Sequence, residues 1–477
     1  MIDKYEIMEF SREFGLRADV IEKDYVLGWM LAGIFHHIDI ESNWVFKGGT
    51  CLKKCYFETY RFSEDLDFTL TDLNHLDQNF LVKCFEDISE WVYDATGIEI
   101  PKELIRFDVY KNNRGGMSAQ GRIGYRGPMQ PRGDLPRIKL DLTFDEILVL
   151  DSTIRDVHHP YSDCPDNGIK SRCYCFEELF AEKIRALAER ERPRDLYDVI
   201  HLYRHEELAS DQTIILSTLE KKCAFKEISV PTMETFRNRP EREELEAEWE
   251  NMLAHQLPAL PSFEQFWVEL PEVMEWVHGV VKKVKKEAIS FGRVSIDKTW
   301  QPPLMAQAWH TEVPLEKIRF AGANRLCVNL YYQNSYRLIE PYSLRLSKEG
   351  NLLLFAVRHN TNEPRSYRVD RIQSAEITNT SFVPKHTVEL TPSGPISAPS
   401  LTRTSGSLSS PRFSIARPTA RRSGIKKPDF GPKHVFKCTI CGKQFTRKKY
   451  NSVLNPHKDK QGYPCSGRTG IFVKTKY

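Results

Sequence analysis

Three aspartates in apolar segments have the types and spacing that chemistry would need. Asp65 and Asp67 stand two positions apart in one such segment, and Asp141 stands in another with the same alternation. In a β-strand, a period of two places Asp65 and Asp67 on one face and the intervening Leu66 on the other. Neighbouring carboxylates repel each other unless a cation lies between them, and Mg²⁺ prefers such oxygen ligands. We therefore predict a Mg²⁺ site, large enough for the two ions of in-line phosphoryl displacement. A solvated strand edge is the alternative, and Asp145 competes for the third position.

A glycine turn precedes the first two acids. Gly48 and Gly49 let the backbone approach a phosphate closely, and the Thr50 hydroxyl offers a further donor. An ordinary turn would have the same composition. Because the acids follow so soon, we predict that this turn binds phosphate.

Four residues near the end of the chain have the types and spacing of a zinc site. They are Cys438, Cys441, His457 and Cys465. Thiolates and imidazole select Zn²⁺, and so short a tail with few large apolar residues needs such a site to fold. His434 could replace His457, and free cysteines are the remaining alternative. Neighbouring basic and aromatic residues suggest phosphate contact and base stacking: Lys443, Arg447, Lys448, Lys449, Tyr450 and Tyr463.

Hydrophobic periodicity predicts an α+β chain in which helices dominate the second half of the first 280 residues. Helices are expected at 1–40, 78–95, 176–191 and 195–205, and strands at 65–70, 104–110, 121–125 and 138–142. Pro193 separates the last two helices. Residues 325–392 alternate in the manner of a small antiparallel barrel or sandwich.

These changes in composition and periodicity along the chain predict five parts. They are a first domain at 1–280, a connector at 281–319, a β-barrel at 320–392, a flexible basic linker at 393–432 and a zinc-binding module at 433–477. The last 77 residues hold 18 Lys+Arg and 2 Asp+Glu, a net charge of +16. The whole chain carries +3, so residues 1–400 carry −13. A basic tail on an acidic body indicates a polyanionic partner, most simply nucleic acid.

Composition excludes several classes of protein. With 40% apolar residues the chain can bury a core, so wholesale disorder is excluded. No apolar run reaches the ~18–20 residues of a membrane helix, and the first residues lack a signal peptide. Eleven cysteines are too few for a disulfide scaffold. We therefore expect a cytoplasmic protein without a membrane partner.

The first domain resembles the AbiEii-type toxin nucleotidyltransferases of the polymerase-β-like superfamily. The resemblance rests on segments 21–25, 46–52 with 61–68, and 178–187, and on Arg190 with 194–198. It implies transfer of a nucleotide from an NTP to an acceptor hydroxyl with release of pyrophosphate. It also implies an NTP-binding turn at Gly48, Gly49 and Thr50, and roles for Lys183 and Asp195.

Each of those two roles has an alternative. Lys183 could be a solvated helical lysine, although with Arg190 and Arg194 it could instead face the triphosphate. Asp195 is well placed to cap the helix that follows. Asp198 is expected to pair with a neighbouring arginine. The catalytic set predicted from the resemblance is Asp65, Asp67, Asp141, Lys183 and Asp195.

The β-rich part resembles a WYL domain, which implies an SH3/Sm-like barrel that senses nucleotides or nucleic acid. The resemblance rests on segments 337–344 and 366–372, with Leu352–Leu354 where such domains read Trp-Tyr-Leu. Arg358, Arg368 and Arg371 are candidates for binding an anion.

Three functions remain open at this stage. The first is a Mg²⁺-dependent nucleotidyltransferase toxin or antiphage-defence effector that modifies RNA, such as tRNA, with a possible antitoxin partner. The second is a catalytically silent sensor of nucleic acid. The third is a transferase that modifies protein.

Overall fold

The computed structural model describes residues 1–477 except 113–114, 131–132, 206–210, 238–240, 285, 292–294, 297–314, 391–432, 448–451, 453, 455–456, 459–463 and 477. The chain divides into two compact units, Met1–Thr402 and Arg403–Tyr477, which are described separately. The predicted linker at 393–432 lies outside the described residues, as do Lys448, Lys449, Tyr450 and Tyr463 and much of the predicted connector.

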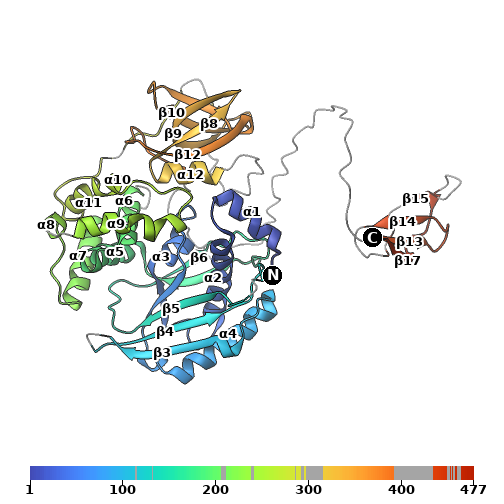
Figure 1. Ribbon diagram of the computed structural model, residues 1–477, viewed down its shortest axis with the longest axis horizontal. Coiled ribbons are helices and arrows are strands. Elements are labelled where there is room, and N and C mark those ends of the chain that lie inside the picture. Colours follow the sequence, from blue (N-terminus) through green and yellow to red (C-terminus); the bar gives the residue numbers. More distant parts are fainter. Residues whose placement is uncertain are drawn as a thin grey trace. The chain divides into compact units, whose positions relative to one another are not determined.

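A seven-stranded mixed sheet forms the centre of the first 175 residues (Figure 1). Its order is β3-β4-β5-β2-β1-β7-β6. The strands are β1 Trp44–Lys47, β2 Asp65–Leu70, β3 Ile105–Lys111, β4 Met117–Gly124, β5 Arg137–Thr143, β6 Thr153–Val157 and β7 Ile169–Cys173. The four predicted strands are present as β2 to β5. The strands β1, β6 and β7 were not predicted.

Two helices bury the apolar face of this sheet. They are α2 Ala18–His36 and α4 Gln78–Thr96, and α1 Lys4–Phe14 packs against α2. The Phe35 ring of α2 lies 6.3 Å from that of Phe68 on β2, and Phe85 of α4 lies 6.1 Å from Trp44 on β1. Phe68 is fully buried. β2 therefore has the predicted alternation, which leaves its aspartates on the opposite face of the sheet.

Short helices form the second half of this region: α5 Phe176–Arg190, α6 Pro193–Arg204, α7 Gln212–Phe225, α8 Met233–Arg237, α9 Glu241–Leu253, α10 Phe263–Trp267 and α11 Leu270–Val277. Pro193 does separate α5 from α6, but it is the first residue of α6. The missing N–H of proline is tolerated there because the first turn of a helix leaves its N–H groups unbonded. The predicted start at residue 195 is therefore two residues late.

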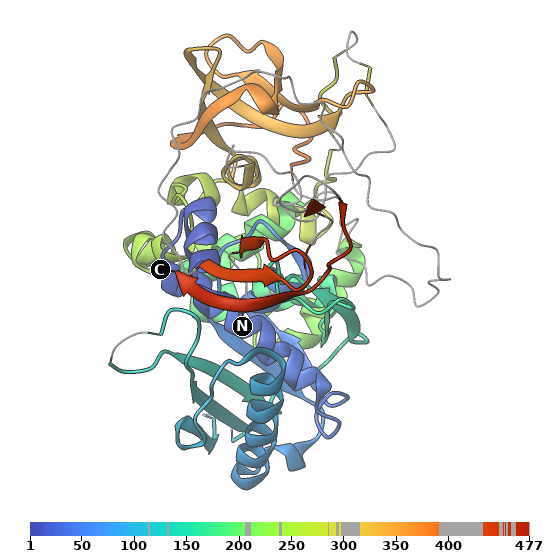
Figure 2. The same cartoon turned by 90° about the vertical axis from the view of Figure 1, so that its right-hand side faces the viewer.

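The rest of the first unit consists of α12 Leu315–Ala323 and a five-stranded antiparallel sheet (Figure 2). Its strands are β8 Leu326–Tyr332, β9 Ser335–Leu346, β10 Leu352–Arg358, β11 Pro364–Arg368 and β12 Ile372–Ser381. The order β11-β10-β9-β8-β12 places β11 and β12 at opposite edges, and no ladder joins them among the described residues. The antiparallel sheet is confirmed, whereas its closure into a barrel stays a prediction.

The second unit holds small sheets. The strands β13 Lys433–Cys438, β14 Gln444–Arg447 and β17 Gly470–Lys476 form one sheet, and β15 His457–Lys458 pairs with β16 Pro464–Cys465. Over the described parts of both units, every helix is too short or too polar to cross a bilayer.

Candidate active site

The glycine turn joins β1 to the helix α3 Gly48–Cys51, which continues into one π-helical stretch, η1 Leu52–Tyr56. Gly48 has φ +81°, and a Cβ there would lie 2.2 Å from Oδ2 of Asp67. A Cβ on Gly49 would lie 2.5 Å from Nη2 of Arg61. Both glycines are therefore required, because the backbone passes directly beneath charged side chains.

The three predicted acids meet in one cavity. β2 and β5 are parallel neighbours in which Asp67 pairs with Asp141, and Asp65 lies on the same face one period earlier. All three line a cavity of about 170 Å³ together with Gly49 and Lys183.

The competing acid lies elsewhere. Asp145 follows β5 and forms an ion pair with Lys226 at 3.2 Å. It also accepts a hydrogen bond from Asn112 at 2.6 Å. Asp145 is not among the residues that line the cavity.

The carboxylates are held in an unfavourable charged state. Burial, and then the charges of Asp141 and Asp65, raise the pKa of Asp67 to about 6. Burial also raises the pKa of Asp65. Within the described part of the chain, neither side chain has a hydrogen-bond or ion-pair partner, whereas Asp141 pairs with Lys139 at 2.6 Å and accepts from Gln120 at 3.2 Å. Two adjacent carboxylates without a partner form a site that a cation would stabilise.

Thr50 has a different contact from the one predicted. Its side chain is fully buried, and the hydroxyl donates to the Asp65 carbonyl oxygen at 2.5 Å. The hydroxyl thus fixes the start of β2 against α3. The backbone of the turn, rather than the Thr50 side chain, is therefore exposed to the cavity.

The cationic wall of the cavity is built from buried ion pairs. Lys183 on α5 contacts Asp198 at 2.7 Å and Asp195 at 3.5 Å, and it is only 7% exposed. Asp195 accepts two hydrogen bonds from Arg190, at 2.7 and 2.8 Å. Asp198 accepts two from Arg61. The pairing of Asp198 with an arginine is confirmed.

Two alternatives from the sequence are therefore wrong. Lys183 is not a solvated lysine, because two carboxylates bury it. Asp195 is not a helix cap, because Arg192 occupies that position and Asp195 lies in the first turn of α6. Its carboxylate instead holds Arg190 and Lys183 at the cavity.

Arg192 and Arg194 also line the cavity. Among the described residues, neither side chain has a hydrogen-bond or ion-pair partner. Burial, and then the neighbouring Arg61, lower the pKa of Arg194. The residue patterns alone did not predict Arg192 or Lys139 as site residues. The period of two on β5 would have indicated Lys139, since it shares a face with Asp141.

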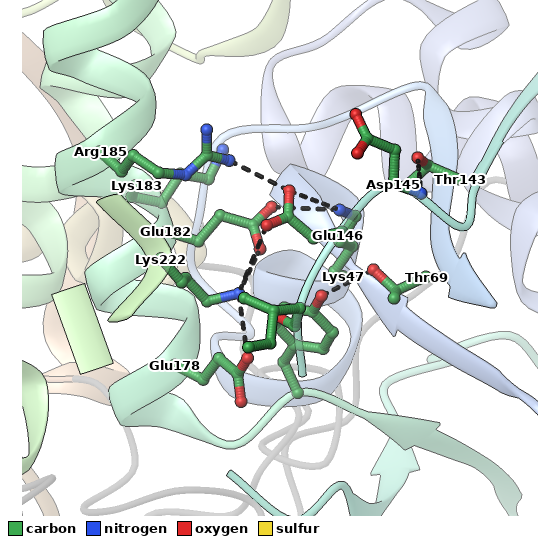
Figure 3. A network of polar contacts seen from close by, with 12 residues as sticks. Lys47, Thr69, Thr143, Asp145, Glu146, Glu178, Glu182, Lys183, Arg185 and Lys222 are labelled. Atoms are coloured by element: carbon green, nitrogen blue, oxygen red, sulfur yellow. Dashed lines mark hydrogen bonds and ion pairs between the residues drawn. The ribbon is translucent and has the colours of Figure 1, made fainter. Parts of the chain in front are cut away.

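A second buried network lies behind the glycine turn (Figure 3). Lys47 contacts Glu182 at 3.5 Å and Glu146 at 3.8 Å, and Lys222 contacts Glu178 at 2.9 Å. These contacts join β1 and the segment after β5 to α5 and α7. Lys47 is therefore a support of the turn and does not line the cavity.

The predicted zinc ligands converge in the second unit. Cys438, Cys441, His457 and Cys465 each offer an atom, and all four atoms lie within 4.8 Å of one another. The backbone N–H groups of Ile440 and Gly467 point at the sulfurs of Cys438 and Cys465, at 3.5 and 3.3 Å.

The neighbourhood of these ligands fits the same arrangement. His434 contacts Thr475 instead, at 3.0 Å, so it is not the imidazole of the cluster. The Phe445 ring packs 4.7 Å from that of His457, and Phe436 is buried with Cys438 and Cys465. Three thiols and one imidazole in a single cluster match a structural Zn²⁺ site.

Two family models match the chain. The family model of the nucleotidyl transferase AbiEii toxin of type IV toxin–antitoxin systems matches residues 29–273, just over half of the chain. A WYL domain model matches residues 314–377. Among solved structures, MenT4, a nucleotidyltransferase toxin from Mycobacterium tuberculosis H37Rv, is 16% identical over 58% of this chain and 90% of its own, with a TM-score of 0.38. JHP933 from Helicobacter pylori is 16% identical over 55% and 94%, with a TM-score of 0.36.

A comparison with curated proteins gave no match. The match to the toxin model, over residues 29–273, includes every residue that lines the cavity. The chain belongs to the AbiEii family of nucleotidyl transferase toxins, and a WYL domain follows the transferase region.

Proposed function

We propose that the protein is a Mg²⁺-dependent nucleotidyltransferase toxin that transfers a nucleotide from an NTP to a hydroxyl of RNA. The observation that carries this is the pair Asp65 and Asp67. Both carboxylates face one cavity without a partner among the described residues, beside Asp141 and opposite arginines. A catalytically silent sensor of nucleic acid would have no need to keep two carboxylates that repel each other.

Asp65, Asp67 and Asp141 would hold one or two Mg²⁺ ions. The raised pKa of Asp67 and the oxygen-only donor set fit such a hard cation. When bound, Mg²⁺ would neutralise phosphate oxygens and the charge that develops on the leaving group.

Backbone and side-chain groups of the protein would bind the triphosphate and move the proton. The backbone N–H groups of Gly48 and Gly49 bind the β and γ phosphates, and Arg194 and Lys183 balance their charge. Asp141 accepts the proton of the acceptor hydroxyl, whose oxygen bonds to the α-phosphorus as the bond to the β-phosphate oxygen breaks. Pyrophosphate then leaves.

The basic tail would bind the RNA that carries the acceptor hydroxyl. The last 77 residues carry the net charge of +16, and a Zn²⁺ at Cys438, Cys441, His457 and Cys465 would fold the end of that basic segment. The toxin–antitoxin family adds the expectation of an antitoxin protein that restrains the activity.

Labelling would test the proposal. Purified protein is incubated with each α-labelled NTP, Mg²⁺ and total RNA, and the label is followed into RNA or protein. The Asp67→Asn variant should lose transfer. Asp108→Asn, the same change on β3 with 71% of the side chain exposed, should keep it.

If the label is found on protein alone, the acceptor is a protein and not RNA. Equal transfer by Asp67→Asn and wild type would remove the carboxylates from the chemistry.

A further inference from the structure

Three cysteines meet beneath the glycine turn, outside the proposed active site. Cys51 ends α3, Cys55 lies on η1 and Cys173 ends β7. Their sulfur atoms all lie within 4.8 Å of one another, and all three residues are fully buried. None of these thiols lines the catalytic cavity.

A buried arginine lies against the same cluster. Arg155 on β6 is 8% exposed, donates from Nε to the carbonyl oxygen of Cys55 at 2.8 Å, and has its guanidinium 4.2 Å from the centre of the Tyr56 ring. Its Nη2 is buried without a hydrogen-bond partner, and among the described residues no carboxylate pairs with Arg155.

A buried cation without an anion is strongly unfavourable. The ionisable groups around Arg155 are the thiols of Cys55 and Cys173, the Tyr56 hydroxyl and the adjacent Asp156, with which Arg155 forms no ion pair in the described part of the chain. The cluster is therefore where the missing negative charge can form.

We propose that Cys51, Cys55 and Cys173 form a buried three-thiolate site for a divalent thiophilic metal ion such as Zn²⁺ or Cd²⁺. Three thiolates and a divalent ion carry a net charge of −1, and Arg155 balances it. A monovalent ion would leave an excess negative charge in the core.

The dimensions also suit this chemistry. A metal–sulfur bond of about 2.3 Å in a trigonal plane separates the sulfurs by about 4.0 Å, inside the observed limit. Thiolates select such soft ions over Mg²⁺. A bound ion would tie α3, η1 and β7 together, and so fix the turn that carries Gly48.

Metal stoichiometry tests the site without reference to activity. The full-length chain is produced in medium supplemented with Cd²⁺, so that the buried site can be loaded during folding. Bound cadmium is then counted by mass spectrometry, and its thiolate charge-transfer absorption is recorded. The tail cluster is silenced separately with Cys438→Ser/Cys441→Ser/Cys465→Ser.

By the charge-transfer absorption, the wild type should retain two thiolate-bound Cd²⁺ ions and the tail variant one. Adding Cys173→Ala to the tail variant should abolish the remaining ion. Adding Arg155→Met should weaken its retention more than Arg155→Lys, which keeps the charge.

Because core substitutions can impair folding, the tail variant alone is decisive. If it retains no cadmium while its transferase unit unfolds at the same urea concentration as that of the wild type, the three sulfurs are only packed thiols and the proposal fails.

Discussion

Replacing Asp67 with asparagine should stabilise the protein while abolishing transfer. Burial and the nearby acids raise the pKa of Asp67 to about 6, from 3.8 in an unfolded chain. The folded state therefore holds this proton more tightly than the unfolded state does. Once the pH exceeds both values, the ionised carboxylate destabilises the fold, and asparagine, which resembles the protonated form, removes that penalty.

The magnitude follows from the shift. One pKa unit corresponds to 1.36 kcal/mol, so a shift of this size is worth about 3 kcal/mol at pH 8. Asp67 is only half-buried, so solvent screening reduces the expected gain to about 1–3 kcal/mol. The gain should be roughly halved near pH 5, fall to about a fifth at pH 4 and vanish near pH 3, where aspartate is protonated in both states.

Urea unfolding at pH 8, 5 and 4 in magnesium-free buffer measures this gain. Asp198→Asn is the control of opposite sign. Arg61 and Lys183 hold the pKa of Asp198 below its usual range against the effect of burial, so its loss leaves buried cations unpaired. That variant should be destabilised by about 3–5 kcal/mol. A stability of Asp67→Asn that equals the wild type at pH 8, or a gain that does not change with pH, would refute this account of the cavity.

Three further outcomes are expected. Below about pH 6 the Mg²⁺ affinity of the wild type should fall by about tenfold per pH unit, since each ion must displace the proton of Asp67, and calorimetric titration measures this. Arg319→Met should lower the free energy of unfolding by about 3 kcal/mol or more in urea, because it leaves Glu58 and Glu316 buried without their cation. Removing Zn²⁺ with a chelator should abolish amide-exchange protection around Cys438 while the β2–β5 ladder stays protected, and unchanged protection at Cys438 would contradict a structural metal.

The sequence predicted those features that depend on one residue and its strand neighbours. β2 and β5 each bury one face, so alternation alone places Asp65, Asp67 and Asp141 on the opposite face. The order in which the strands pair is not written in that pattern. The approach of Asp141 to Asp67 was therefore a hypothesis from residue types and alternation, and the parallel register of β2 and β5 confirms it.

The wrong alternative for Lys183 and the missed strand β6 have a common cause in contacts between distant residues. Lys183 looks like a surface lysine because its partner Asp198 is fifteen positions later on another helix. β6 was missed because Arg155 interrupts its apolar pattern, although that arginine is buried against Cys55 and Tyr56. In both cases a tertiary contact buries a charge that local hydropathy assigns to the surface.

The ion pairs of the cavity divide its charges into two classes. Asp195 and Asp198 neutralise Arg190, Lys183 and Arg61, which fixes those cations in place. Asp65 and Arg194 face the same cavity and attract each other, yet no hydrogen bond or ion pair joins them in the described part of the chain. Opposite charges kept apart in this way are already oriented when a ligand arrives, so little reorganisation is needed at the moment of reaction. A metal–triphosphate complex, with cations for the acids and phosphates for the arginine, is the ligand whose own charges match this separation.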